Sequence, residues 1–202
     1  VFVSVFAGTV FLGASSALAA SGTWNGTQNS MWTNSANWSA LPYPSGNDTA
    51  TFVGGGSGRT ALDLTGLSGI ANITFTGTSV AAYTLGAAGQ KVTLQPGGTI
   101  RLAADAANSQ TIQEDLELPS GAVSFTFRND HPDRTLTLGK VHGYTSGGVT
   151  KSVYFDGAGP IALLRNLECM QSTVNVYHRT TNTVSFGGAA TNLTVLYLDG
   201  TN

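Results

Sequence analysis

From residue 72 onward, apolar and small polar side chains alternate with a period of two, and Gly, Asn, Asp or Pro interrupts the runs. Successive side chains of a β-strand point to opposite faces, so this alternation is typical of strands with one buried face. No segment between the runs keeps a helical period. The strands are expected at residues 72–77, 91–95, 98–103, 111–118, 122–128, 134–139, 152–157, 173–177, 182–188 and 192–200.

Short strands at this spacing fit either a β-solenoid or a β-sandwich of the jelly-roll type. Two features favour the solenoid, a right-handed parallel β-helix. The outward positions hold Thr, Ser, Asn and Gln, which suits ladders of equivalent residues about 4.8 Å apart, where like charges would repel. The strings "YTLG", "TLTLG", "SVYFDGAG" and "TVSFGGAA" also share an apolar-x-apolar-Gly ending, as expected of repeating coils.

In this solenoid, strands from residue 60 onward should pair in parallel, with inward side chains stacked in columns. The inward residues are expected to include Ile73, Phe75, Leu136, Leu138, Phe155 and Phe186.

The first 19 residues resemble the apolar region and cleavage site of a secretory signal peptide, without its basic start. The string Ala17-Leu18-Ala19 supplies small residues where a signal peptidase reads. The sequence thus predicts an extracellular or cell-surface protein, with a Trp-rich cap at 20–56 and a solenoid over 57–202 that continues beyond this range. No membrane span is expected after the signal.

All three Trp residues of the chain lie between residues 21 and 52, in a stretch otherwise rich in Asn, Ser, Thr, Gly and Pro. One hypothesis is that Trp24, Trp32 and Trp38 cover the open end of the solenoid, which needs large apolar side chains. The other is that they bind ligand by stacking on sugar rings. The sequence favours the cap and leaves the sugar platform open.

The order Trp24, Trp32, Ala36-Asn37-Trp38, the prolines at 42 and 44, and Asp48-x-Ala50-x-Phe52 resembles secreted bacterial proteins of the autotransporter-associated β-strand repeat family. The resemblance covers the N-terminal cap and the first coils. It implies a surface-displayed parallel β-helix without enzymatic activity. The family's Gly-Thr-Leu-x-Leu-x-Gly units are approached only by "GGTIRLA", "RTLTLG" and "NTVSFGG".

Charge and cysteine content narrow the function further. Charged residues make up 10% of the chain, the net charge is -2, and no basic stripe suggests a nucleic-acid partner. Cys169 is the single cysteine, so no internal disulfide can form, and its apolar neighbours predict a core position rather than a catalytic thiol.

Catalysis in a β-helix would need carboxylates gathered on neighbouring coils. The richest ionisable cluster is "RNDHPDR" at residues 128–134, which is interpreted as a solvated turn with Asx side chains bonding the local backbone. In "TIQEDLEL", alternation sends Glu114 away from Asp115 and Glu117. The latter two could form a cation site on one face, but the interpretation favoured is two solvated outward residues. No catalytic residue, metal site or cofactor is expected.

The function expected is therefore non-enzymatic: a structural or adhesive passenger-like β-helix whose partners are polysaccharide or other cell-surface components. A polysaccharide lyase or glycoside hydrolase is the alternative among enzymes. A carbohydrate-binding module that uses the Trp-rich segment is the third hypothesis.

Overall fold

A computed structural model describes residues 20–121, 123–144, 150–170, 173–191 and 195–198. The expected signal peptide at 1–19 lies outside the described residues, as does the side chain of Cys169. Two 3-10 turns, Ser35–Asn37 and Gly56–Gly58, accompany the strands. The strands are β1 Gly22–Thr23, β2 Gly46–Phe52, β3 Ala61–Leu62, β4 Gly69–Phe75, β5 Thr84–Leu85, β6 Lys91–Leu102, β7 Gln110–Ile112, β8 Asp115–Leu118, β9 Ser124–Asn129, β10 Leu136–Leu138, β11 Val141–Tyr144, β12 Thr150–Gly157, β13 Ile161–Leu163, β14 Leu167–Met170, β15 Thr173–Thr180, β16 Val184–Phe186, β17 Ala190–Thr191 and β18 Val195–Leu198.

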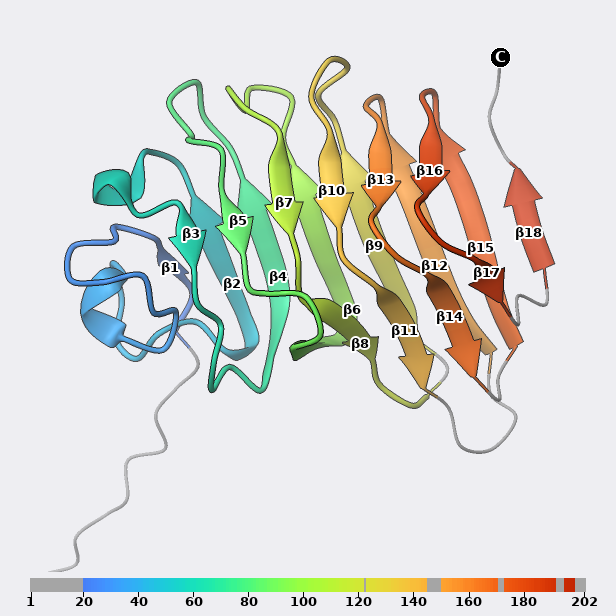
Figure 1. Ribbon diagram of the computed structural model, residues 1–202, viewed down its shortest axis with the longest axis horizontal. Coiled ribbons are helices and arrows are strands. Elements are labelled where there is room, and N and C mark those ends of the chain that lie inside the picture. Colours follow the sequence, from blue (N-terminus) through green and yellow to red (C-terminus); the bar gives the residue numbers. More distant parts are fainter. Residues whose placement is uncertain (1–19, 122, 145–149, 171–172, 192–194, 199–202) are drawn as a thin grey trace, which may run out of the picture.

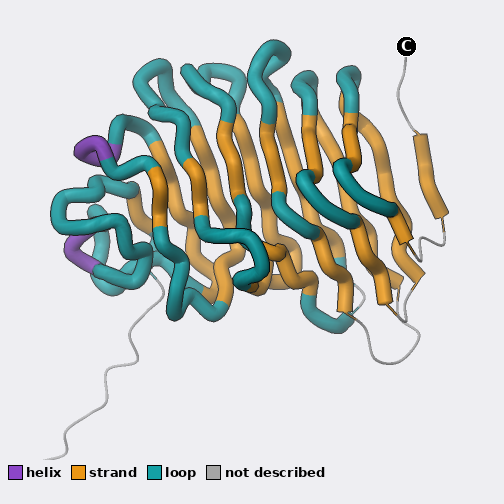
Figure 2. Tube along the Cα trace, viewed as in Figure 1, coloured by secondary structure: helices purple, strands orange, loops and turns teal. Residues whose placement is uncertain are grey.

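The strands wind into a parallel β-solenoid, so the predicted all-β fold is confirmed and the β-sandwich alternative is wrong (Figure 1). Every pairing between two named strands is parallel and joins strands of different coils. One sheet runs through β3, β5, β7, β10, β13 and β16, and the other sheet contains the remaining twelve strands. Figure 2 shows loops and turns joining the strands at the rims of each coil.

The long strand β6 bends across two faces of the solenoid. Its first part pairs with β8 through Lys91–Thr93, and its last part pairs with β9 through Thr99–Leu102. In later coils these two positions belong to separate strands. The expected strands 91–95 and 98–103 are therefore one strand, whereas the expected strand 111–118 is broken into β7 and β8 by a corner at Gln113 and Glu114.

The inward side chains stack in columns along the solenoid axis. Phe52 pairs with Phe75, 23 residues later, and their rings stack with centroids 5.0 Å apart. Phe127 pairs with Phe155, 28 residues later, at 5.6 Å. The changing coil length explains why the sequence period drifts. Burial of the predicted inward residues Ile73, Phe75, Leu136, Leu138 and Phe155 is confirmed.

Phe186 is the exception, because its side chain is 39% exposed. It lies on β16, and no further strand pairs with β16 among the described residues. The prediction that Phe186 points inward is confirmed, because Phe186 pairs with the buried Leu163 and its ring lies 6.3 Å from that of Phe155, but no strand of a following coil covers it among the described residues.

The apolar-x-apolar-Gly strings mark one corner of the solenoid in three coils. Gly86, Gly139 and Gly187 directly follow β5, β10 and β16, which occupy equivalent positions in one sheet. A Cβ on Gly139 would lie 2.3 Å from the backbone oxygen of Glu114, so neighbouring coils approach too closely there for a side chain. Gly157 ends β12 in the other sheet, so its string is not equivalent.

The solenoid starts earlier than expected. β2 pairs in parallel with β4 and belongs to the first coil, although the cap was predicted to extend to residue 56. Residues 20–45, hereafter the cap, form a layer of loops at one end of the solenoid (Figure 1).

Candidate functional site

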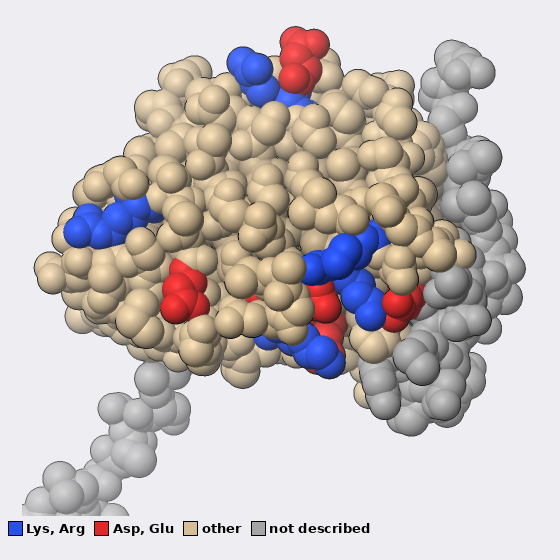
Figure 3. Space-filling view, in the orientation of Figure 1, with Lys and Arg blue, Asp and Glu red and all other residues tan. Residues whose placement is uncertain are grey.

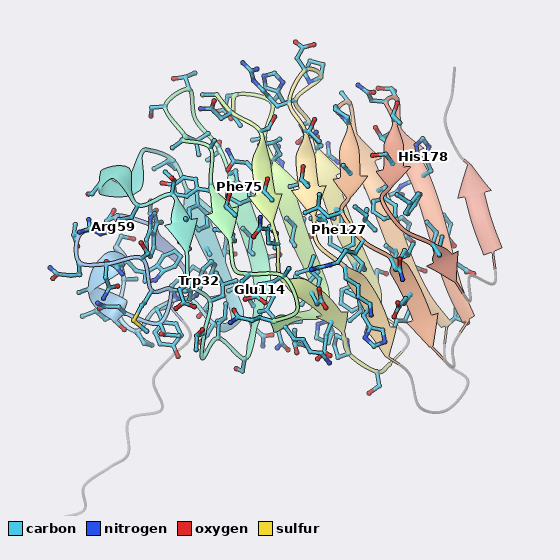
Figure 4. All side chains as sticks on the ribbon, viewed as in Figure 1. Trp32, Arg59, Phe75, Glu114, Phe127 and His178 are labelled. Atoms are coloured by element: carbon cyan, nitrogen blue, oxygen red, sulfur yellow. The ribbon has the colours of Figure 1, made fainter. Side chains whose placement is uncertain are left out.

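The three Trp residues of the cap are core residues. Their side chains are 2%, 0% and 5% exposed for Trp24, Trp32 and Trp38. The Trp38 ring lies 4.7 Å from the Trp32 ring and 5.1 Å from the Trp24 ring, and all three lie against Phe52 of the first coil. Sugar stacking by these Trp residues is therefore contradicted, because no indole face reaches the surface, and the cap arrangement is observed instead. Figure 4 shows Trp32 at the capped end.

Each buried indole also has a hydrogen-bond acceptor. Trp24 Nε1 donates to the carbonyl of Arg59, Trp32 Nε1 to that of Pro44 at 2.8 Å, and Trp38 Nε1 to that of Trp32 at 2.7 Å. A buried N–H without an acceptor would cost free energy. The rings of the three Trp residues are therefore buried, and their N–H groups are paired within the protein, so neither group is available to a ligand.

Asn37, directly before Trp38, organises the loops of the cap. Its buried Oδ1 accepts hydrogen bonds from the backbone N–H groups of Gln28 and Asn29. Its Nδ2 donates to Asn29 Oδ1 and to the carbonyl of Met31. One amide therefore holds four groups, which gives a physical reason for the Asn-Trp pair of the sequence motif.

The cap also covers the strand edges of the first coil. Trp24 N–H donates to the carbonyl of Thr51 on β2. Directly after β3, Asp63 N–H donates to the carbonyl of Ser30, and Trp32 N–H donates to the carbonyl of Asp63. Exposed edges of this kind pair with other chains and promote aggregation. The cap therefore closes this end of both sheets.

The cluster at residues 128–134 begins with Arg128 and Asn129 at the end of β9 and continues as the predicted turn toward β10. His131 N–H donates to Asn129 Oδ1, as in an Asx turn. Asp130 accepts hydrogen bonds from Arg128 and from Arg101 of the preceding coil, so its carboxylate is occupied by two guanidinium groups. The turn interpretation is confirmed, and the cluster supplies an ion-pair network at the rim.

Glu114 lies at the corner between β7 and β8 and is the least expected feature of the structure. Its side chain is 1% exposed, whereas Asp115 and Glu117 lie on the outer side, as alternation predicts. Burial raises the pKa of Glu114 to about 7, against a hydrogen bond from the Ala87 backbone that lowers it, and the negative charge of Asp115 adds to the increase. The Oε2 atom is buried and has no hydrogen-bond partner.

Residues distant in the sequence create this environment. A Cβ on Gly86 would lie 2.0 Å from Cγ of Glu114, so only a glycine leaves room for the buried side chain. Arg165 reaches across the glycine at position 139 to donate to the carbonyl of Gln113 at 2.7 Å and to pair with Asp115. Figure 4 shows Glu114 close to the loop that follows β5.

Two grooves of about 370 Å³ each open at this corner. The first is lined by Leu62, Asp63 and Gly86, and the second by Leu64, Leu67 and Glu114, among other residues. Thr65 and Gln90 line both, so the grooves are neighbours. Hydrogen bonds from Thr65 hold the pKa of the exposed Asp63 below its usual value. Figure 3 shows that most of this face is uncharged and that its largest group of charged side chains lies in the lower half.

Lys151 is another buried charged residue. Its side chain is 0% exposed and its Nζ donates to the carbonyls of Pro119 and Gly121. These carbonyls belong to the turn before β9, in the preceding coil. Lys151 therefore links two coils from inside the solenoid. Its position on the inner face follows the alternation of β12, in which Val153 and Phe155 are also buried.

The outer face of β12 and β15 carries stacked aromatic and charged side chains. The rings of Tyr154 and Tyr177 pair in register at 4.6 Å between centroids with an interplanar angle of 18°. Arg179 lies over the Tyr154 ring at 4.2 Å and makes a two-point ion pair with Asp156. The stacked rings face one another along the ladder, so this arrangement stabilises neighbouring coils.

Within the described residues, no group of three or more His, Cys, Asp and Glu side chains could hold a metal ion. The same part of the chain contains no helix with the length and hydropathy needed to span a bilayer. Comparisons with protein-family models, curated proteins and solved structures find no match to the chain.

Proposed function

We propose that this chain is an extracellular, non-enzymatic β-solenoid with a structural or adhesive role at a cell surface, where it contacts polysaccharide or other surface components. The observation that supports the proposal best is the cap. Because β1 of the cap pairs with β2, and because the cap also forms hydrogen bonds with Asp63 directly after β3, the cap covers the strand edges at this end of the solenoid. A closed end suits a protein that must stay soluble while it displays its long faces.

The outer faces suit such display. Outward residues pair in register between coils, as do Thr51 with Thr74 and Thr137 with Ala162. Parallel pairing at about 4.8 Å holds these side chains in rigid rows, so an extended partner meets the same spacing repeatedly. The resemblance of the Trp24 to Phe52 stretch to surface-displayed passengers supports the same role.

Bead adhesion tests the proposal. Beads coated with residues 20–202 are expected to remain, after washing, on bacterial cells or on films of purified polysaccharide in larger number than uncoated beads. Thr126→Glu and Thr137→Glu add a charge to the outer face of one sheet each and identify the face in contact. Retention no greater than that of uncoated beads on every surface would show that the adhesive role is wrong.

A polysaccharide-active hydrolase is the second candidate, and one observation favours it. Glu114 and Asp63 line neighbouring grooves, and their environments shift their pKa values in opposite directions. An acid with a raised pKa beside an ionised base is the pair that glycoside hydrolysis uses. The assay measures the release of reducing ends from polysaccharide. Release by the native chain and by Glu117→Gln, with no release by Glu114→Gln or by Asp63→Asn, would favour this candidate over the non-enzymatic role.

A further inference from the structure

The paired grooves beside Glu114 combine apolar walls with a few polar groups. The exposed Ala61 and Ala87 contribute apolar surface to the first groove, Leu62, Leu64 and Leu67 lie buried beneath the two grooves, and Thr65 and Gln90 contribute polar side chains to both. Sites for small polar ligands are concave and mostly apolar, with a small number of placed polar groups. The corner therefore has the composition of a binding site.

Glu114 gives the second groove a buried acceptor that the protein leaves unused. Its side chain lines the groove, yet Oε2 has no hydrogen-bond partner among the described residues. Leaving a buried polar atom unpaired is unfavourable, so such atoms are rare unless a ligand or solvent molecule pairs with them. No other buried carboxylate oxygen of the described residues lacks a partner.

We propose that the two neighbouring grooves bind a neutral saccharide segment, one hydroxyl of which donates a hydrogen bond to Glu114 Oε2. The inference rests on the proposed function and deepens it, because it assigns a site and a ligand class to the surface contact. The exposed Ala61 and Ala87 give the first groove apolar surface for the C–H face of a sugar ring, and Thr65 and Gln90 can pair with further hydroxyls.

The charges around the grooves disfavour the other ligand classes. Asp63 lines the first groove and Glu114 the second, so an anionic ligand would meet two carboxyl groups. Lys91 at the edge of the second groove is paired with Glu117 at 2.6 Å. No group of three or more potential metal-binding side chains is present in the described part of the chain. A hydroxyl-rich neutral ligand meets none of these obstacles.

Titration by NMR tests the site in residues 20–202 at pH 8, where Glu114 is ionised. The probes are cellotriose, xylotriose, mannotriose and N,N′,N″-triacetylchitotriose. At least one is expected to shift the amide signals of Thr65, Gln90 and Glu114 in a saturable manner. Glu114→Leu removes the acceptor at similar volume and should weaken binding at least tenfold, whereas Asp133→Asn, which removes an exposed carboxylate in the turn before β10, should bind as the unmodified chain does.

The proposal is overturned if none of the four sugars shifts these three signals, or if Glu114→Leu binds with unchanged affinity while its spectrum shows a folded chain. The second result would mean that Oε2 pairs only with solvent. Bead adhesion separates this failure from failure of the proposed function. Adhesion without sugar binding would show that the grooves are not the sugar site and would leave the adhesive role standing. Sugar binding without adhesion would support the site and contradict the adhesive role.

Discussion

Replacing Trp38 with Ala measures how much the cap contributes to the stability of the solenoid. Truncating a buried aromatic residue to Ala costs about 3 to 5 kcal/mol, because transfer energy is lost and a cavity is left. Trp38 packs on Trp32, Trp24 and Phe52 with centroid distances of 4.7, 5.1 and 5.9 Å. Each aromatic pair adds about 0.5 to 1.5 kcal/mol beyond area burial. The expected loss is therefore at the upper end, about 4 to 5 kcal/mol.

The loss should be local before it is global. In a solenoid, stability is approximately a sum over coils and their interfaces, so a damaged cap first exposes the coil beneath it. Hydrogen exchange is expected to accelerate at Ala50 and Phe52 of β2 before it changes at Phe127 of β9. Urea denaturation gives the total change in the free energy of unfolding, and hydrogen exchange gives its distribution along the chain.

Met31→Ala is the matched control, because Met31 lies in the same cap but is 42% exposed. Surface substitutions usually change stability by less than about 0.5 kcal/mol. If Trp38→Ala also changes the free energy of unfolding by less than about 1 kcal/mol, the cap does not depend on the indole cluster and the packing argument is refuted.

Three further substitutions probe the corner, the cap amide and the contact between coils. Ionisation of Glu114 opposes folding because its pKa rises from 4.5 to about 7, so Glu114→Gln should match the native chain below pH 4.5 and exceed its free energy of unfolding at pH 8 by up to about 3 kcal/mol; equal differences at both pH values would contradict this. Asn37→Ala leaves two backbone N–H groups without their acceptor and should cost about 2 to 4 kcal/mol in urea denaturation, against less than about 0.5 kcal/mol for the exposed Asn47→Ala, and equal losses would argue against the amide. Gly157→Ala places a Cβ 2.0 Å from a backbone oxygen at a φ of 103° and should cost about 3 to 5 kcal/mol, whereas Gly89→Ala at a φ of 86° in open space should cost about 1 to 2 kcal/mol, so similar melting temperatures would count against the close approach.

The alternating pattern predicted the longer strands from β4 onward and the inward columns, because the direction of a side chain in a strand depends only on its place in the alternation. It did not predict β1, β2, β3, β5, β11, β13, β14 and β17, most of which are too short to show an alternation. Phe75 and Leu138 could be assigned to the core in this way, and both are buried. The same rule assigned Phe186 to the inside, but burial there also depends on a following coil. The sequence therefore predicted which way each side chain points, but it did not predict whether another coil buries that side chain.

The choice between a cap and a sugar platform needed the tertiary structure. An indole combines a large apolar surface with one N–H donor, so Trp suits a core and a ligand-binding surface equally well. The decision came from acceptors and partners elsewhere in the chain, such as the carbonyl of Arg59 for Trp24 and the ring of Phe52 for all three Trp residues.

For Glu114, too, the sequence predicted the direction of the side chain, whereas the tertiary structure decided its chemical environment. Alternation alone predicted that Glu114 points away from Asp115, and the structure agrees. Its burial, its raised pKa and its unpaired oxygen depend on Gly86, 28 residues earlier, and on the loops that form the grooves. The sequence by itself determined the two faces of the strands that alternate clearly, because these faces follow from neighbouring residues. Only the stacking of coils decided which carboxyl group lost its water, because desolvation depends on residues that the fold brings together.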